Sequence, residues 1–133
     1  MDLLSSLTQY SDWGLLALRV AIAAIFLQHG LMKKGMWKMQ PSEQMPAKMI
    51  NQMRLLSIAE PLGAMAILFG FLTQWAAIGL GIIMLGAITF KTKVWHTPFM
   101  AQDKTGWELD FLILAACIAL LLNGAGAISL DTL

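Results

Sequence analysis

The sequence predicts an all-α protein, an integral membrane four-helix up-and-down bundle. Of its 133 residues, 58% are hydrophobic and only 13% are charged, and the mean hydropathy is +0.68; a soluble domain is about a quarter charged. Four apolar runs alternate with polar segments, and a helix needs about 20 mostly apolar residues to cross the bilayer core. The length predicts a single domain, residues 1–133.

The first predicted span covers residues 13–32 and contains one charged residue, Arg19. Burying an arginine costs about 3 kcal/mol on an insertion scale, whereas each Leu, Ile, Phe or Val returns about 0.3 to 0.6 kcal/mol. The apolar residues therefore outweigh Arg19, and the span should insert. No basic residue precedes Arg19 and no small-residue cleavage site follows the run, so we expect an uncleaved span rather than a signal peptide.

Three further spans are predicted at residues 55–72, 75–90 and 107–123, with Glu60–Pro61 near the start of the second. A tight turn at Thr73–Gln74 joins the second span to the third. The chain then crosses the bilayer four times, and its two longer loops lie on one side.

Two pairs of glycines are spaced seven residues apart, so each pair shares one face of its helix. The pairs are Gly63 with Gly70 in the second span and Gly79 with Gly86 in the third. Small residues let helix backbones approach closely in lipid. We expect all four glycines to serve helix packing.

Basic residues predict the orientation. The loops at residues 33–54 and 91–106 hold five and three Lys or Arg residues, and the N-terminal lead, the short turn and the tail hold none. The positive-inside rule then places both loops in the cytoplasm and both termini outside it.

Ionisable residues should gather at the cytoplasmic level. Helix rise places His29 about 5 Å, and Glu60 about 8 Å, from the inner ends of their spans. A carboxylate facing lipid is costly, so Glu60 should face the bundle and find a partner. The candidates for a ligand or proton site are His29, Glu60, Lys33, Lys91, Lys93 and Glu108. Two interpretations stay open: a polar lock between helices, or a site that binds a polar head group or relays protons.

Two acidic residues, Glu108 and Asp110, lie in the first turn of the fourth span. Because this turn is close to the membrane surface, we expect at least one of them to be a solvated anchor.

Arg19 lies about 9 Å below the opposite surface, too far along the bilayer normal to meet Glu60. The candidate partners at its own level are Asn123, Gln74 and, if the tail folds back, Asp131. Snorkelling to the surface is the alternative. We expect Arg19 and Asp131 to be structural charges.

Several kinds of site are not expected. The single cysteine, Cys117, excludes an internal disulfide and a Cys-rich metal site. His29 and His96 are the only histidines, and no third ligand is arranged with them, so no metal is assigned. The net charge of +1 does not indicate the basic surface that a nucleic-acid-binding protein needs. The methionines at positions 45, 49 and 53 are spaced four residues apart, so we expect them to form one stripe on a short helix before the second span. Apolar contact with the membrane interface would explain this stripe.

The order and spacing of five segments resemble the DoxX family of small bacterial membrane proteins, over about residues 13–131. The segments are Leu18–Lys34, Glu60–Thr73, Met84–Ile88, Gly106–Asp110 and Ile128–Asp131. The positions that match the family pattern are Arg19, His29, Gly30, Lys33, Glu60, Gly63, Gly70, Glu108 and Asp131. The resemblance implies a four-helix membrane bundle. It also links some members to subunits of quinol oxidase or thiosulfate:quinone oxidoreductase systems.

These observations favour an accessory subunit of a quinone-linked redox system in the bacterial inner membrane, with a head-group pocket around His29 and Glu60. A small-solute transporter or exporter and a purely structural or assembly partner are the alternatives. No intrinsic cofactor is expected, and quinone is the candidate ligand. The expected partners are the lipid bilayer and either a redox subunit or further copies of the chain, with no nucleic acid.

Overall fold

The computed structural model describes residues 2–133, and within them the chain is all-helical with no strand. This confirms the predicted fold class. The α-helices are α1 (Ser11–Met32), α2 (Ala47–Phe69), α3 (Thr73–Lys93) and α4 (Glu108–Asn123), and the short 3-10 helices are η1 (Ser5–Tyr10), η2 (Lys33–Trp37) and η3 (Leu130–Thr132). Three helical segments, 5–37, α2 and α3, are long and apolar enough to cross a membrane. The protein is therefore a multi-pass membrane protein.

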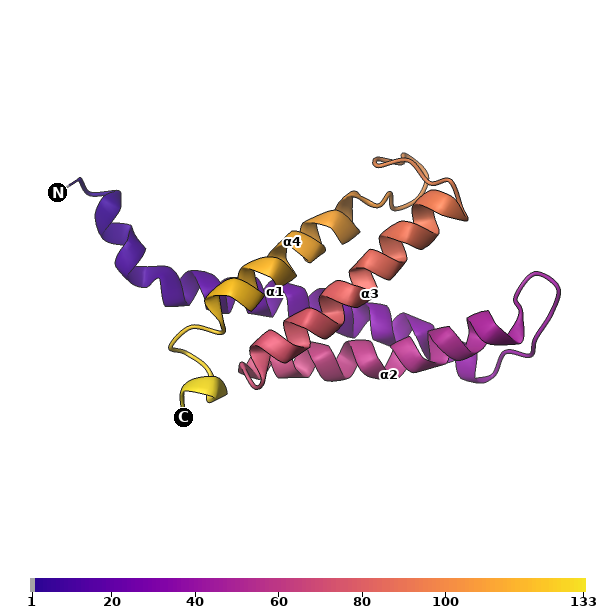
Figure 1. The fold of residues 1–133 in the computed structure, drawn as a ribbon, viewed down its shortest axis with the longest axis horizontal. Helices are drawn as coiled ribbons and strands as arrows, with labels where there is room; N and C mark the ends of the chain where they lie inside the picture. The colour runs from indigo at the N-terminus through magenta and orange to yellow at the C-terminus, as the bar shows by residue number, and fades with distance from the viewer. Residues whose placement is uncertain (1) are drawn as a thin grey trace.

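The helices form two antiparallel hairpins. α1 packs along α2, and α3 packs along α4, while α2 and α3 link the two hairpins through fewer contacts. Figure 1 shows that the hairpins cross at an angle and diverge toward the ends that carry the two long connections. We call this the loop end, with connections 38–46 and 94–107, and the opposite end, with the α2–α3 turn and the tail 124–133, the turn end.

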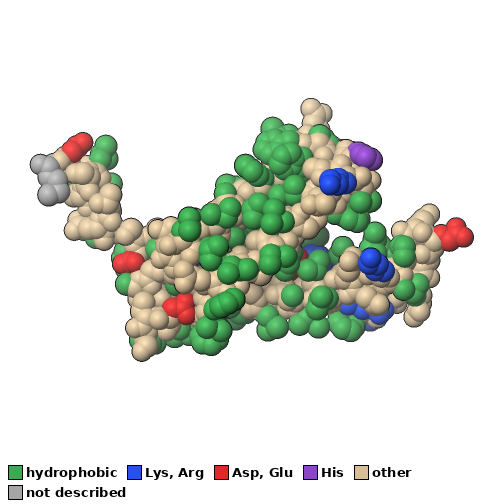
Figure 2. All heavy atoms as spheres, viewed as in Figure 1, with side chains coloured by type: hydrophobic (Ala, Val, Ile, Leu, Met, Phe, Trp, Pro, Cys, Tyr) green, Lys and Arg blue, Asp and Glu red, His purple; other side chains and the backbone are tan. Residues whose placement is uncertain are grey.

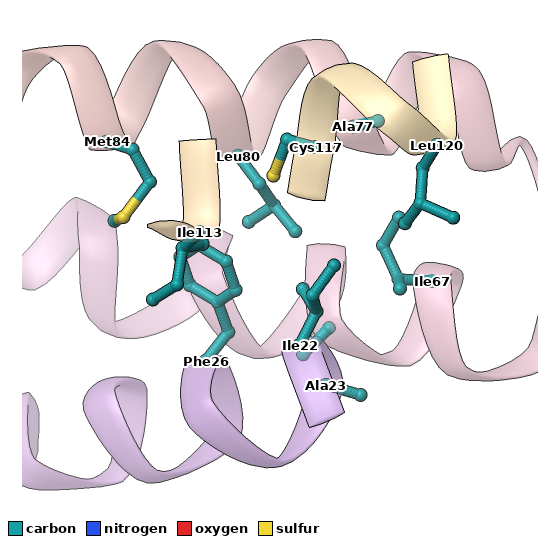
Figure 3. Close-up of a cluster of buried hydrophobic side chains, with 11 residues drawn as sticks. Ile22, Ala23, Phe26, Ile67, Ala77, Leu80, Met84, Ile113, Cys117 and Leu120 are labelled. Carbon is teal, nitrogen blue, oxygen red and sulfur yellow. The ribbon is translucent and has the colours of Figure 1, made fainter. Parts of the chain in front are cut away.

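A single apolar core holds the hairpins together in the middle of the molecule and toward the turn end. Its buried members come from all four helices (Figure 3): Ile22, Ala23, Phe26, Ala64, Ile67, Ala77, Leu80, Met84, Ile113, Cys117 and Leu120. Many other large apolar side chains cover the outer surface (Figure 2), as the lipid-facing sides of membrane helices require. The core does not reach the loop end, where the hairpins separate.

Two helix boundaries differ from the prediction. α2 begins at Ala47 rather than at residue 55, so Glu60 and Pro61 lie well inside a helix. The methionines at positions 49 and 53 belong to α2 and not to a separate short helix. Hydropathy placed the boundary too late because four polar residues, Lys48, Asn51, Gln52 and Arg54, interrupt the first two turns of α2.

The expected turn at Thr73–Gln74 is in fact at residues 70–72, and α3 begins at Thr73. Gly70 has φ +66° and Leu72 has φ +48°, so the chain reverses through the left-handed region. Glycine adopts this conformation without the steric cost that other residues incur. Gly70 therefore ends α2 and is not part of a packing face with Gly63.

The other glycines divide into two groups. A Cβ at Gly63 would lie 2.7 Å from Leu80 Cδ2, so this position does pack closely against α3. Around Gly79 and Gly86 no described atom would meet a Cβ within 4 Å, so these two positions do not form a packing contact within the chain.

Arg19 joins the tail to the end of α2. Its side chain is 1% exposed, and it donates four hydrogen bonds to carbonyl oxygens: Nε to Ile67 at 2.8 Å, Nη2 to Leu68 at 2.7 Å, and Nη1 to Ala125 at 3.0 Å and Ile128 at 2.7 Å. Carbonyls in the last turn of a helix lack the usual intrahelical donors. The guanidinium supplies a donor to Leu68 and a second one to Ile67, which also accepts from the Gly70 N–H. The tail does fold back onto Arg19. None of the hydrogen bonds of Arg19 goes to the candidates Asn123, Gln74 or Asp131, and the charge of Asp131 acts on it without a direct bond.

Candidate ligand-binding site

A cavity of about 740 Å³ lies at the loop end, between the diverging hairpins. The space-filling view shows the molecule hollowed between its two arms there (Figure 2). Most of the lining is apolar: Met32, Met49, Met53, Leu55, Leu56, Ile83, Met84, Gly86, Ala87, Phe90 and Trp95. The polar lining consists of His29, Lys33, Gln52, Glu60, Lys91 and Asp110. This size and composition are typical of small-molecule sites.

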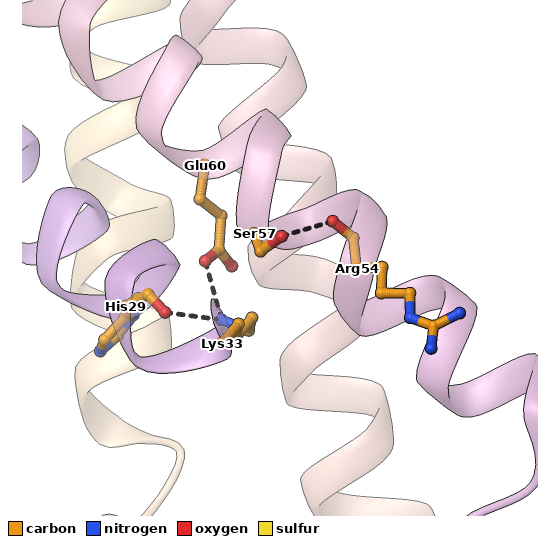
Figure 4. Close-up of polar contacts among 5 residues, drawn as sticks. All are labelled: His29, Lys33, Arg54, Ser57 and Glu60. Atoms are coloured by element: carbon orange, nitrogen blue, oxygen red, sulfur yellow. Dashed lines mark hydrogen bonds and ion pairs between the residues drawn. The ribbon is translucent and has the colours of Figure 1, made fainter. Parts of the chain in front are cut away.

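The first hairpin contributes an ion pair to the cavity. Lys33 Nζ lies 2.7 Å from Glu60 Oε2 and also donates to the carbonyl of His29 at 3.5 Å (Figure 4). Glu60 is 2% exposed, so its charge is taken out of water. A buried carboxylate needs such a partner. The sequence required a partner for Glu60, and in the structure that partner is Lys33.

Close approach of α1 and α2 makes this pair possible. A Cβ at Gly30 would collide with the ring of Pro61, so only glycine lets the two helices cross at this point. Gly30 follows His29 and Pro61 follows Glu60 in the chain. The contact therefore brings the functional candidates to the same level.

The second hairpin contributes a matching ion pair. Lys91 Nζ lies 2.6 Å from Asp110 Oδ2 and donates to the carbonyl of Gly106 at 3.4 Å. Lys91 is in the last turn of α3, and Asp110 is in the first turn of α4 with 4% of its surface exposed. Each hairpin thus carries a lysine near the end of its first helix paired with an acid on its second helix.

His29 lines the same cavity as the two ion pairs. The side chain is half-buried and packs edge-to-face with Phe26, with ring centroids 6.4 Å apart. Within residues 2–133 its ring nitrogens make no hydrogen bond to the protein. The imidazole is therefore free to donate to, or accept from, a molecule in the cavity.

Two predicted site residues lie elsewhere. Lys93 is exposed and Glu108 is half-buried, and neither lines the cavity. Asp110 takes the place expected for Glu108, because successive residues turn by about 100° around a helix and these two therefore point to different sides. The sequence put both acids in the same turn, but it did not determine which side of α4 would face the bundle.

Among the described residues, no three His, Cys, Asp or Glu side chains are grouped so that they could hold a metal ion. The polar chemistry of the cavity is that of two ammonium groups, two carboxylates, an imidazole and the amide of Gln52. These groups can donate hydrogen bonds, accept them and exchange protons.

A family model described as DoxX matches residues 14–93. The match covers nearly all of α1 and all of α2 and α3, and it includes His29, Lys33, Glu60 and Lys91; Asp110 of α4 lies beyond it. No curated protein and no solved structure matches the chain.

Proposed function

The chain belongs to the DoxX family, and we propose that it is an accessory subunit of a quinone-linked redox system whose head-group site is the cavity at the loop end. The observation that carries the proposal is the cavity itself, an apolar space with ionisable groups from both hairpins at its edge. The proposal places the loop end on the cytoplasmic side of a bacterial inner membrane. Eight of the nine basic residues lie in the segments 33–54 and 91–106, which meet at the loop end.

Quinone chemistry fits the lining in two respects. The ring carbonyls need hydrogen-bond donors, and the ammonium groups of Lys33 and Lys91 and the imidazole of His29 are donors. Reduction of a quinone also requires protons, and Glu60 and His29, which both line the cavity, are groups that can carry a proton. The apolar lining would hold the ring and the start of an isoprenoid tail. Electron transfer itself is assigned to a partner subunit.

The test uses Glu60→Gln and Glu60→Leu in the purified protein and in a deletion strain complemented with each variant. Gln is close to Glu in size and still forms hydrogen bonds, so Glu60→Gln should keep the folded protein. It should abolish the quinone-linked respiratory phenotype, because an amide does not relay a proton. Glu60→Leu should also reduce the quinone that co-purifies. Melting temperature in detergent, quinone content and respiration are measured together.

Glu108→Gln is the matched control, since Glu108 lies near the same level and does not line the cavity. It should behave as the wild type. A folded Glu60→Gln protein with wild-type respiration and quinone content would show that the Lys33–Glu60 pair only holds α1 and α2 together. Solute flux in proteoliposomes that depends on Glu60 would favour a transporter instead.

A further inference from the structure

Each lysine of the cavity keeps one unused hydrogen-bond donor. An ammonium group has three N–H donors. Lys33 uses two of them, on Glu60 and on the carbonyl of His29. Lys91 also uses two, on Asp110 and on the carbonyl of Gly106. One N–H therefore remains on each hairpin.

Each carboxylate of the cavity likewise keeps one unused oxygen. The ion pairs engage Glu60 Oε2 and Asp110 Oδ2. Glu60 Oε1 and Asp110 Oδ1 accept no hydrogen bond from any residue in the range 2–133, and both side chains line the cavity. Each ion pair can thus offer a bound molecule one donor and one acceptor.

Charge balance narrows the class of ligand. Two ammonium groups and two carboxylates sum to zero, and each charge is already paired at 2.6 or 2.7 Å. An ionic ligand would have to break one of these pairs in a partly desolvated space, which is costly. A neutral molecule can use the unused donors and acceptors while both pairs stay intact.

We propose that the two ion pairs act as two facing walls that hold one neutral ring by its two oxygens, one oxygen on each hairpin. A carbonyl oxygen would accept from the unused N–H of a wall, and a hydroxyl would donate to the unused carboxylate oxygen. The site would therefore bind both the dicarbonyl and the dihydroxy form of the same ring. This inference rests on the proposed function and specifies how its site recognises the ligand.

The remaining lining explains why the apolar part of such a ligand need not be unique. Four methionines, Met32, Met49, Met53 and Met84, line the cavity. Methionine is unbranched and polarisable, so it adapts to irregular apolar shapes. Recognition then depends on the two oxygens, and the substituents meet an adaptable surface.

The experiment removes one wall at a time. The paired variants Lys33→Met/Glu60→Leu and Lys91→Met/Asp110→Leu each replace an ion pair by apolar side chains, an exchange that buried pairs often tolerate. Binding of decylubiquinone and decylubiquinol to the detergent-solubilised protein is measured by the ligand-induced rise in melting temperature. Each variant should bind both forms roughly ten- to a hundredfold more weakly than the wild type, because a hydrogen bond to a charged group is lost.

Two further variants keep the result interpretable. Asp110→Asn keeps the size of the side chain and an oxygen for Lys91 to donate to, but an amide NH₂ group replaces the second carboxylate oxygen. It should therefore weaken the binding of decylubiquinol roughly tenfold and that of decylubiquinone much less. Lys93→Met removes an exposed lysine that does not line the cavity, and it should change nothing. Equal weakening of decylubiquinol and decylubiquinone in Asp110→Asn would mean that the carboxylate oxygen does not recognise the hydroxyl, and would overturn the inference.

The possible outcomes distinguish a failure of the two-wall inference from a failure of the proposed quinone site. No rise in the melting temperature of the wild type with either form would remove the proposed quinone site. Wild-type binding that is lost with the Lys33–Glu60 pair and unchanged without the Lys91–Asp110 pair would leave a quinone site with one wall, and the two-wall inference would be wrong. Binding of decylubiquinone alone would contradict the role given to the carboxylates.

Discussion

Asp131 caps α3: its Oδ2 accepts a hydrogen bond from the backbone N–H of Thr73 at 3.0 Å, and its Oδ1 accepts one from Leu72 at 2.7 Å. The first N–H groups of a helix have no intrahelical acceptor, and a carboxylate there also meets the positive end of the helix dipole. Asp131 is therefore a structural charge that acts on α3, while Arg19 acts on α2. Both residues fasten the tail to the α2–α3 turn.

The cap predicts an acid-sensitive contribution to stability. Partial burial raises the pKa of Asp131, but hydrogen bonds from Thr73 and Leu72 and the charge of Arg19 outweigh this effect and leave the pKa below its ordinary value. The folded state thus binds the proton less well than the unfolded state. The stabilisation is complete above the unfolded pKa of about 3.9 and is lost as pH falls through the lower folded pKa.

Asp131→Asn should reduce this acid dependence, because an amide does not titrate. Melting temperatures of the wild type and the variant from pH 7 down to pH 3 measure the effect. The two curves should converge at the acid end. Asp131→Ala should cost about 1 kcal/mol near neutral pH, as for other helix caps. Parallel curves over the whole range would show that Asp131 contributes nothing through its charge.

Arg19→Ala should be among the most damaging substitutions in the protein. It would leave three carbonyl groups without a donor, because the fourth, that of Ile67, also accepts from the Gly70 N–H. Each buried unsatisfied group costs about 1 to 3 kcal/mol. Arg19→Lys should rescue little, because an ammonium lacks the planar fork that reaches separate acceptors. Resistance to unfolding by denaturant in detergent measures the loss.

Arg54→Ala is the comparison, since Arg54 also donates to two loop carbonyls but is only half-buried. It should cost clearly less than Arg19→Ala. Because the tail carries both Asp131 and two acceptors of Arg19, the double variant Arg19→Ala/Asp131→Ala should be less unstable than the sum of the single variants. Strict additivity would show that the tail is not a shared element.

Gly30→Ala should separate α1 from α2 where Pro61 crosses. The added methyl group would overlap the proline ring, and overpacking of this kind costs about 1 to 3 kcal/mol. Gly14→Ala is the matched control in the same helix, since nothing lies within 4 Å of its Cβ position; it should be neutral or stabilising, because alanine is the better helix former. Unfolding in detergent measures both. Equal stability of the two variants would mean that the crossing is not tight.

The orientation is testable by labelling. The basic residues predict that both termini are extracytoplasmic. A cysteine placed at residue 133, with Cys117→Ala to remove the buried thiol, should react with a membrane-impermeant maleimide added to intact spheroplasts. Reaction only after lysis would invert the topology and with it the side of the membrane that the cavity faces.

Hydropathy was sufficient to predict the four helices, because crossing a bilayer imposes a length and a composition that the sequence shows directly. Helix rise alone also placed Glu60 near Lys33. The sequence did not separate Glu108 from Asp110, because that choice depends on the rotation of α4 about its axis. Gly70 was assigned to a packing face because its spacing is helical; its positive φ is a property of the turn that follows.

The length of α4 has a consequence for the surrounding lipid. With 16 residues, it rises about 24 Å, some 6 Å less than the bilayer core. The helical segment 5–37 of the other hairpin has 33 residues. One side of the protein is therefore matched to a thinner membrane than the other, and lipid chains beside α4 must shorten or splay at an elastic cost. A neighbouring protein with short spans would share that deformation, so hydrophobic mismatch alone would draw partners toward the α4 side.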